Sequence, residues 1–177
     1  METKNFEIVS SQSRIEWIGR KVTGAHDGTI NIARGTFNVA DGKLTGGEFT
    51  IDTTSIKILD IEDEATNAQF AGHLASDDFF AIEKYPEANL VITSLTSKTV
   101  GEYHIEGKLT IKGITHPVAF DAAVSINSDL LTATGKITID RTKYEMKFRS
   151  GNFFQNLGDT LIYNDFDLNI SVTAKAA

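Results

Sequence analysis

Cysteine is absent from this chain of 177 residues. A chain without thiols forms no disulfides, offers no thiolate nucleophile and binds no metal through sulfur. Proline occurs only twice, and no apolar run approaches the ~18 residues that a membrane-spanning helix needs. These absences exclude disulfide scaffolds, cysteine-dependent enzymes and helical transmembrane segments. The length fits a single domain, which we place at residues 1–177.

Positive charge is scarce as well. The chain has 17 Lys and Arg residues against 24 Asp and Glu residues, which gives a formal net charge of −7. An acidic surface repels the phosphate backbone of nucleic acids, so we expect no nucleic-acid partner. Residues 1–17 contain no apolar segment with a small-residue cleavage site, as a secretory signal would. We therefore expect a cytoplasmic protein, or a periplasmic one if a leader has been removed.

Alternation of apolar and polar residues is the main pattern that is present. It recurs in about eight segments, separated by turn-forming pairs such as Asp41-Gly42. The triplet His26-Asp27-Gly28 is interpreted as a further turn. We predict an all-β protein of eight antiparallel strands, which must form a sandwich or close into a barrel. A barrel of about eight strands has an interior that its own side chains can fill or that can hold one small ligand.

One region between two predicted strands departs from this alternation. Residues 60–75 (DIEDEATNAQFAGHLA) place apolar and small residues at helical spacing, and acidic residues precede them, as suits the positive end of a helix dipole. Residues 76–78 (Ser-Asp-Asp) then provide a second N-cap. The turn of helix that would follow carries Phe79, Phe80 and Ile82. We predict a helical insertion at about residues 60–82.

The order of several motifs is similar to that of a known family. Five segments resemble, in this order, the signatures of the YceI-like domain: SRIEWIGRKVTGAHDGTI (13–30), LTGGEFTIDTTSI (44–56), HLASDDFFAIEKYPEA (73–88), GEYHIEGKLTIKGITHPVAFDA (101–122) and ITIDRTKYEMKFRSGNFF (137–154). The third segment is the most specific. The resemblance covers nearly the whole chain and implies a lipocalin-like antiparallel barrel. It also implies a ligand, a long isoprenoid chain such as a polyprenyl phosphate or a quinone tail, held in an internal apolar tunnel.

An isoprenoid chain can bind without any hydrogen bond, because burial of apolar surface contributes about 25 cal/mol per Å². The alternating strands and the helical insertion supply the apolar residues that we predict to bind it: Trp17, Ile30, Phe37, Phe49, Ile51, Leu74, Phe79, Phe80, Ile82, Leu90, Ile92, Phe120 and Ile137. Two questions stay open. A slip of one residue exchanges the two faces of a strand, so the sequence does not decide which face points inward. Phe79 and Phe80 either line the tunnel or plug one end of a filled core.

A polar head group would need hydrogen-bond donors at the mouth of the barrel. The basic and aromatic stretch at residues 140–160 supplies three candidates for binding it, Arg141, Tyr144 and Arg149. We expect no metal and no organic cofactor. The four histidines, His26, His73, His104 and His116, lack ligand spacing. The chain also has neither a G-x-S-x-G elbow nor a phosphate-binding glycine loop.

These patterns favour a binding protein, without catalysis, that transports, stores or sequesters a lipid. One alternative is an enzyme that modifies an isoprenoid or lipid at the barrel mouth, with His73 and Asp78 as an acid–base pair. The other is a structural barrel with a filled core. The sequence leaves the oligomeric state open, including a homodimer.

Overall fold

Nine antiparallel strands and one α-helix make up the described part of this computed structural model, which is residues 3–22, 24–148, 150 and 162–177. The strands are β1 (Thr3–Ile8), β2 (Arg14–Lys21), β3 (Gly24–Ala40), β4 (Lys43–Ile58), β5 (Glu87–Thr99), β6 (Glu102–Ile111), β7 (Ile114–Asn127), β8 (Leu130–Asp140) and β9 (Ile162–Ala176). The helix, α1 (Glu64–Ala75), connects β4 and β5. Two 3-10 turns, η1 (Ser10–Gln12) and η2 (Arg141–Tyr144), follow β1 and β8.

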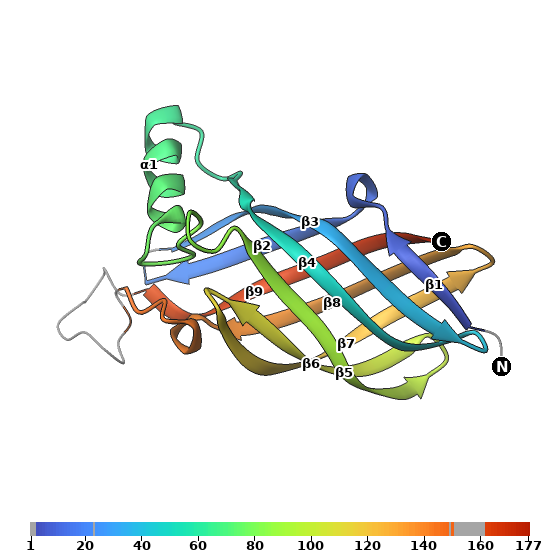
Figure 1. Ribbon diagram of the computed structural model, residues 1–177. Helices are drawn as coiled ribbons and strands as arrows, with labels where there is room; N and C mark the ends of the chain where they lie inside the picture. Colours follow the sequence, from blue (N-terminus) through green and yellow to red (C-terminus); the bar gives the residue numbers. More distant parts are fainter. Residues whose placement is uncertain (1–2, 23, 149, 151–161) are drawn as a thin grey trace.

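The sheet closes into a barrel with eight strand positions (Figure 1). From β2 to β9 each strand pairs with the next, and β9 pairs back with β2. β1 pairs with the far ends of β3 and β9, so it continues the line of β2 beyond the interruption at η1. Closure removes the free sheet edges that would otherwise aggregate. The predicted eight-stranded antiparallel barrel is confirmed.

The end of the barrel that carries both chain termini is packed solid. Phe6, Leu131 and Ala174 have no exposed surface there. The hydroxyl of Tyr103 accepts a hydrogen bond from the backbone N–H of Leu44 at 3.2 Å, which fixes two walls of this end together. Because the barrel is closed at this base, anything that enters it comes from the opposite end.

The helical insertion lies at the opposite end, which we call the mouth (Figure 1). The carboxylate of Asp63 caps α1 by accepting hydrogen bonds from the hydroxyl and the backbone N–H of Thr66, and these bonds hold the pKa of Asp63 below its ordinary value. α1 is shorter than the predicted insertion, because residues 60–62 precede this cap and hydrogen-bonded turns follow Ala75. The insertion therefore occupies the predicted place, but only its first half is α-helix.

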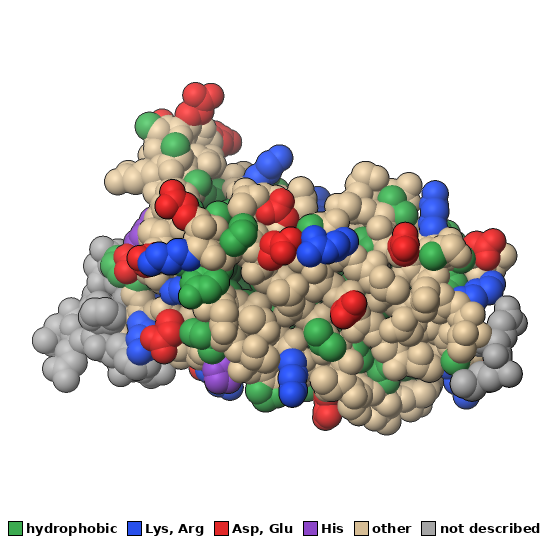
Figure 2. All heavy atoms as spheres, viewed as in Figure 1, with side chains coloured by type: hydrophobic (Ala, Val, Ile, Leu, Met, Phe, Trp, Pro, Cys, Tyr) green, Lys and Arg blue, Asp and Glu red, His purple; other side chains and the backbone are tan. Residues whose placement is uncertain are grey.

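Acidic side chains gather at the outer end of α1, where the helix begins, and charges of both signs are spread over the barrel wall in this view (Figure 2). Within the described residues, no helix has the length and apolar content that a membrane span requires. The residues that line the interior of the barrel are mostly apolar, in contrast to this outer surface.

Candidate functional site

The interior of the barrel is hollow towards the mouth. It contains a cavity of about 740 Å³, which lies within the range of about 300–1,000 Å³ that is usual for small-molecule sites. Inward-facing Phe49, Ile51, Phe120 and Leu168 line it and remain partly exposed, because no side chain meets them across the cavity. Their exposure contrasts with the complete burial of Phe6 and Leu131 at the closed base.

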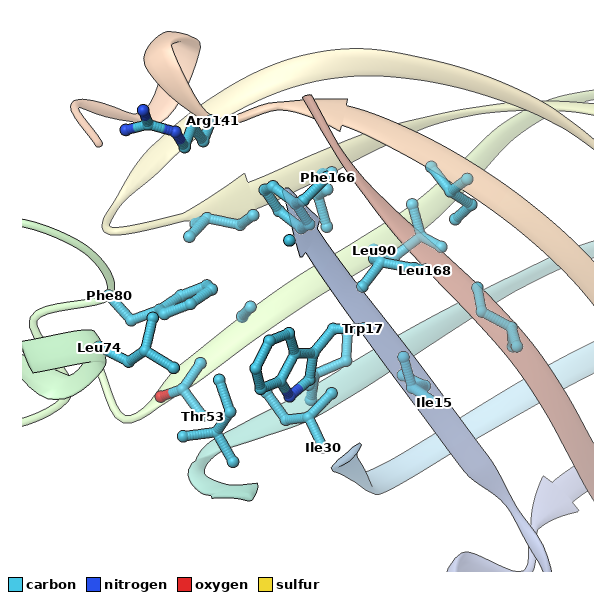
Figure 3. Close-up of a pocket in the computed structure, with 18 of the residues that line it drawn as sticks. Ile15, Trp17, Ile30, Thr53, Leu74, Phe80, Leu90, Arg141, Phe166 and Leu168 are labelled. Carbon is cyan, nitrogen blue, oxygen red and sulfur yellow. The ribbon is translucent and has the colours of Figure 1, made fainter. Parts of the chain in front are cut away.

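Most of the residues that the sequence predicts for binding lie in the wall of this cavity (Figure 3). Thirteen of them line it: Trp17, Ile30, Phe37, Phe49, Ile51, Leu74, Phe79, Phe80, Leu90, Ile92, Phe120, Ile137 and Arg141. The strand register thus settles which alternate face points inward, a choice that the sequence leaves open. Contact between these residues and a ligand remains a prediction.

Three predicted residues have a different position. Ile82 does not line the cavity, because Ala81 adopts a positive φ of 47° and turns the chain, after which the Ile82 N–H donates to the carbonyl of Ala75. Tyr144 does not line it either. The chain curls into η2 after β8, and the ring of Tyr144 packs edge-on against His116 with centroids 5.3 Å apart. These positions do not favour direct ligand contact by Ile82 or Tyr144. Arg149 lies outside the described residues.

Other wall residues were not selected from the sequence. They include Ile15, Ile32, Thr53, Ile105, Leu109, Ile111, Val124, Met146, Phe148, Phe166, Leu168, Ile170 and Val172. Most belong to the same alternating patterns, so the signal that could have found them is the period-two spacing itself. Phe166, Leu168, Ile170 and Val172 follow one another along one face of β9, for example.

An aromatic cluster borders the mouth beneath α1. The ring of His73 packs edge-on against Phe79 and Phe148, with centroid distances of 5.0 Å and 4.5 Å. Phe79 is buried, and Phe80 and Leu74 point towards the cavity from the same segment (Figure 3). Since these residues border an open space, the geometry supports their interpretation as part of a cavity wall rather than as a plug in a filled core.

The guanidinium group of Arg141 lies beside this cluster, 5.9 Å from the centre of the Phe79 ring. Arg141 is only 3% exposed, and burial lowers its pKa, although the charge of Asp140 opposes this effect. Its nitrogens donate to the backbone carbonyls of Met146, Ile162 and Tyr163. The last two carbonyls belong to an irregular start of β9, where the pairing with β2 shifts register. Arg141 therefore binds the start of β9 where its pairing with β2 is irregular.

Three of the four histidines lie beside a carboxylate. His26 lies 2.8 Å from Asp60, His73 lies 3.0 Å from Asp78 and His104 lies 2.9 Å from Asp121. In the part of the chain that the structure describes, no three His, Asp or Glu side chains gather as metal ligands would. The His26–Asp60 pair joins β3 to the start of the insertion, whereas His73 and Asp78 both lie within the insertion.

Solved structures share this architecture. BcnA from Burkholderia cenocepacia superposes with a TM-score of 0.74 at 20% identity, covering 95% of this chain and 99% of that one. A polyisoprenoid binding domain from Saccharophagus degradans, implicated in plant cell wall breakdown, superposes with a TM-score of 0.68 at 11% identity, covering 99% of this chain and all of the other. At these identities the likeness shows the fold alone.

Sequence relatives are similar over shorter stretches. Protein YceI from Escherichia coli O157:H7 is 32% identical over 147 residues, which are 78% of this chain and 71% of the relative. A UPF0312 protein from Shewanella denitrificans is 37% identical over 84 residues, or 48% of this chain. The match spans only 39% of that relative and less than half of the similar UPF0312 proteins from Pseudomonas putida and Vibrio parahaemolyticus. The family model of the YceI-like domain matches residues 6–174, nearly the entire barrel, and the chain therefore belongs to the YceI-like domain family.

Proposed function

We propose that this protein binds a long apolar molecule, a polyisoprenoid, inside its barrel and thereby carries or sequesters it. The observation that carries the proposal is the cavity of about 740 Å³ with a mostly apolar wall. Membership of the YceI-like family supports it, as does the fold shared with a domain that is named for polyisoprenoid binding. The cavity also argues against a structural barrel with a filled core.

The size of the cavity suits a chain of several isoprene units. An apolar cavity of about 150 Å³ holds one six-carbon ring, and this cavity is about five times as large. It is therefore on the scale of 30 carbon atoms, or about six isoprene units. Each five-carbon unit contributes roughly 4 kcal/mol when buried, at about 0.8 kcal/mol per CH₂. Because association costs at least about 4 kcal/mol, affinity should rise with chain length until the cavity is full.

Trp17 provides the measurement, because it is the one tryptophan of the chain and lines the cavity. Titration with polyprenols of increasing length should shift its fluorescence, with affinity levelling off near six units. Solvent extraction of the purified protein, followed by mass spectrometry, should recover an isoprenoid. The absence of both co-purified lipid and uptake of added polyprenol would overturn the proposal.

Two neighbouring alanines of β7 give a matched control for this titration. Ala122 lines the cavity, whereas Ala123 is exposed on the outer face. Ala122→Phe fills part of the interior and should lower polyprenol uptake, while Ala123→Phe adds the same group outside and should leave it unchanged. Equal uptake by the two variants would place the lipid elsewhere.

One observation favours a second function. The Nε2 atom of His73 lies 3.0 Å from Asp78 Oδ2, and His73 lines the cavity, so an acid–base pair stands at the mouth. An enzyme that modifies the bound lipid would lose turnover on His73→Ala while keeping lipid uptake. If the wild-type protein shows no turnover of a bound isoprenoid, this second function is excluded and the proposed binding function stands alone.

A further inference from the structure

The cavity ends at a defined layer of side chains inside the barrel. On three neighbouring strands, the deepest residues that still line it are paired in register: Val124 in β7, Ala133 in β8 and Val172 in β9. Two positions further towards the base, the paired residues no longer line it: Ile126, Leu131 and Ala174. Residues two apart along a strand face the same side. The second layer therefore lies directly beneath the first, and we call it the floor of the cavity.

Leu131 is the central side chain of this floor. It pairs with Ile126 on one side and with Ala174 on the other, and it has no exposed surface. Phe6 of β1 has no exposed surface either, and it pairs with Phe37 of β3, which still lines the cavity. Directly paired side chains lie side by side on one face of a sheet. Leu131 and Phe6 therefore close the base from two sides of the barrel.

A close-packed floor of this kind yields to a ligand only at a cost. Protein interiors are packed as densely as organic crystals, and extra methylene groups forced into them are unfavourable. The mouth is different, because Gln69 of α1 is exposed and Phe80 is only partly buried, although both line the cavity. An apolar chain that has reached the floor can therefore extend only outwards, past the mouth.

We infer that Leu131, together with Phe6, sets the number of isoprene units that the barrel buries. The inference rests on the proposed function, because it concerns the same apolar chain in the same cavity. Each unit adds to the affinity by burying apolar surface until the far end of the chain meets the floor. Any further unit stays outside the mouth and adds little. The protein therefore discriminates against chains too short to fill the cavity, and it does not reject longer ones.

Ala133→Leu tests this inference by raising the floor. The space that a leucine side chain leaves when it is reduced to alanine can hold a six-carbon ring, so an added leucine should take the room of about one five-carbon unit. In a titration with polyprenols of increasing length, followed by the fluorescence of Trp17, affinity should level off about one unit earlier than in wild type. The shortest polyprenols should bind as before. Ala119→Leu adds the same group to the exposed outer face of β7 and should leave the levelling-off length unchanged.

Leu131→Ala tests the inference in the opposite direction. It opens space beneath Ala133, so affinity should go on rising for about one further isoprene unit. The substitution also removes buried packing, and circular dichroism shows whether the variant is folded. Because Ala133→Leu leaves the floor itself in place, that variant decides the question if Leu131→Ala does not fold.

The outcomes separate this inference from the proposed function. An unchanged levelling-off length in Ala133→Leu, or in folded Leu131→Ala, would overturn the inference and leave lipid binding intact. Loss of all polyprenol binding in Ala133→Leu would overturn it as well, because the cavity above the raised floor should still hold short chains. If the wild-type protein binds polyprenols of no length, the proposed function itself fails.

Discussion

The indole ring of Trp17 lies directly on the backbone of Gly28. A Cβ atom added to Gly28 would overlap the carbonyl oxygen of Lys57 and would lie 2.6 Å from Trp17 Cζ2. The sequence predicts a turn at residues 26–28, and this prediction is wrong. Gly28 pairs with Trp17 on one side and with Ile58 on the other, so β3 runs straight through the triplet. The glycine is required here for close approach and not for a turn.

Gly28→Ala should therefore lower the free energy of unfolding by at least about 1–3 kcal/mol, the usual cost of overpacking, because backbone and indole must both shift. It should also change the emission of Trp17. Denaturant unfolding measures the first effect. Gly72→Ala is the control, because a Cβ there meets nothing within 4 Å in α1, and this variant should gain about 0.5–1 kcal/mol. A Gly28→Ala protein as stable as wild type would contradict the observed packing.

Tyr144 is 1% exposed, and its hydroxyl has no hydrogen-bond partner among the described residues. Removing an unsatisfied buried hydroxyl relieves its desolvation cost. Tyr144→Phe should therefore leave the free energy of unfolding unchanged or raise it by up to about 1 kcal/mol. Tyr103→Phe is the contrast, because that hydroxyl accepts from the N–H of Leu44. Its loss should cost about 1–2 kcal/mol. Equal destabilisation by both changes would reveal a partner for Tyr144.

The same hydroxyl predicts a pH dependence. Burial raises the pKa of Tyr144 from 10.0 to about 12. Between these values the unfolded chain releases a proton that the folded chain retains, so this residue's contribution to stability is lost as the pH rises. Tyr144→Phe should escape that loss, and its advantage over wild type should grow from pH 10 upwards. Stability curves of wild type and variant that remain parallel in alkali would contradict the prediction.

Asp167 links three strands on the outer wall. Its carboxylate accepts hydrogen bonds from Arg20 in β2 and Thr138 in β8, both at 2.7 Å, and Lys136 lies 3.8 Å away. Burial alone would raise the pKa of Asp167, but these hydrogen bonds and charges outweigh burial, so the pKa lies below its ordinary 3.8. A carboxyl group of this kind stabilises the fold at pH values above its pKa in the unfolded chain. This contribution is lost as the pH falls through its pKa in the folded chain.

We expect Asp167→Asn to lower the free energy of unfolding by about 1–2 kcal/mol at neutral pH, a range that allows for screening at the partly exposed Arg20. The difference from wild type should shrink as the pH falls below 3.8, where the unfolded chain is already protonated. Asp129→Asn is the control, because it removes an exposed ion pair with Lys4 at 3.4 Å and should change the free energy of unfolding little. A difference for Asp167→Asn that persists undiminished in acid would rule out the charge as its cause.

Phe79 and Phe80 should separate stability from binding. Phe79 is 8% exposed and packs against His73, so Phe79→Ala should cost about 3–4 kcal/mol of stability. Phe80 is only partly buried and points into the cavity. Phe80→Ala should therefore have the smaller effect on stability, yet weaken polyprenol binding up to about tenfold through lost apolar contact. Binding unaffected by Phe80→Ala would mean that the lipid stops short of the mouth.

The sequence predicts much of this architecture because strand periodicity and turn chemistry are local properties. Alternation marks β7 and β9, and Asp41-Gly42 forms the expected hairpin turn, with positive φ values of 51° and 77°. The turn predicted at Gly28 is absent, because this glycine allows two neighbouring strands to pack closely. The position of the Tyr144 ring could not be predicted for a similar reason, because its direction depends on η2 and His116 rather than on neighbours in sequence.

By itself, then, the sequence determines that the chain forms a β-protein with a helical insertion and that enough apolar side chains alternate to line or fill its interior. Only the tertiary structure decides which face is the inner one, that the base is sealed around Phe6 and Leu131, and that a cavity remains beneath α1. Likewise, Lys21 and Arg141 both line the cavity because β2 and β8 both flank β9. Periodicity is a property of one strand, whereas a hollow interior depends on how eight strand positions close around a common axis.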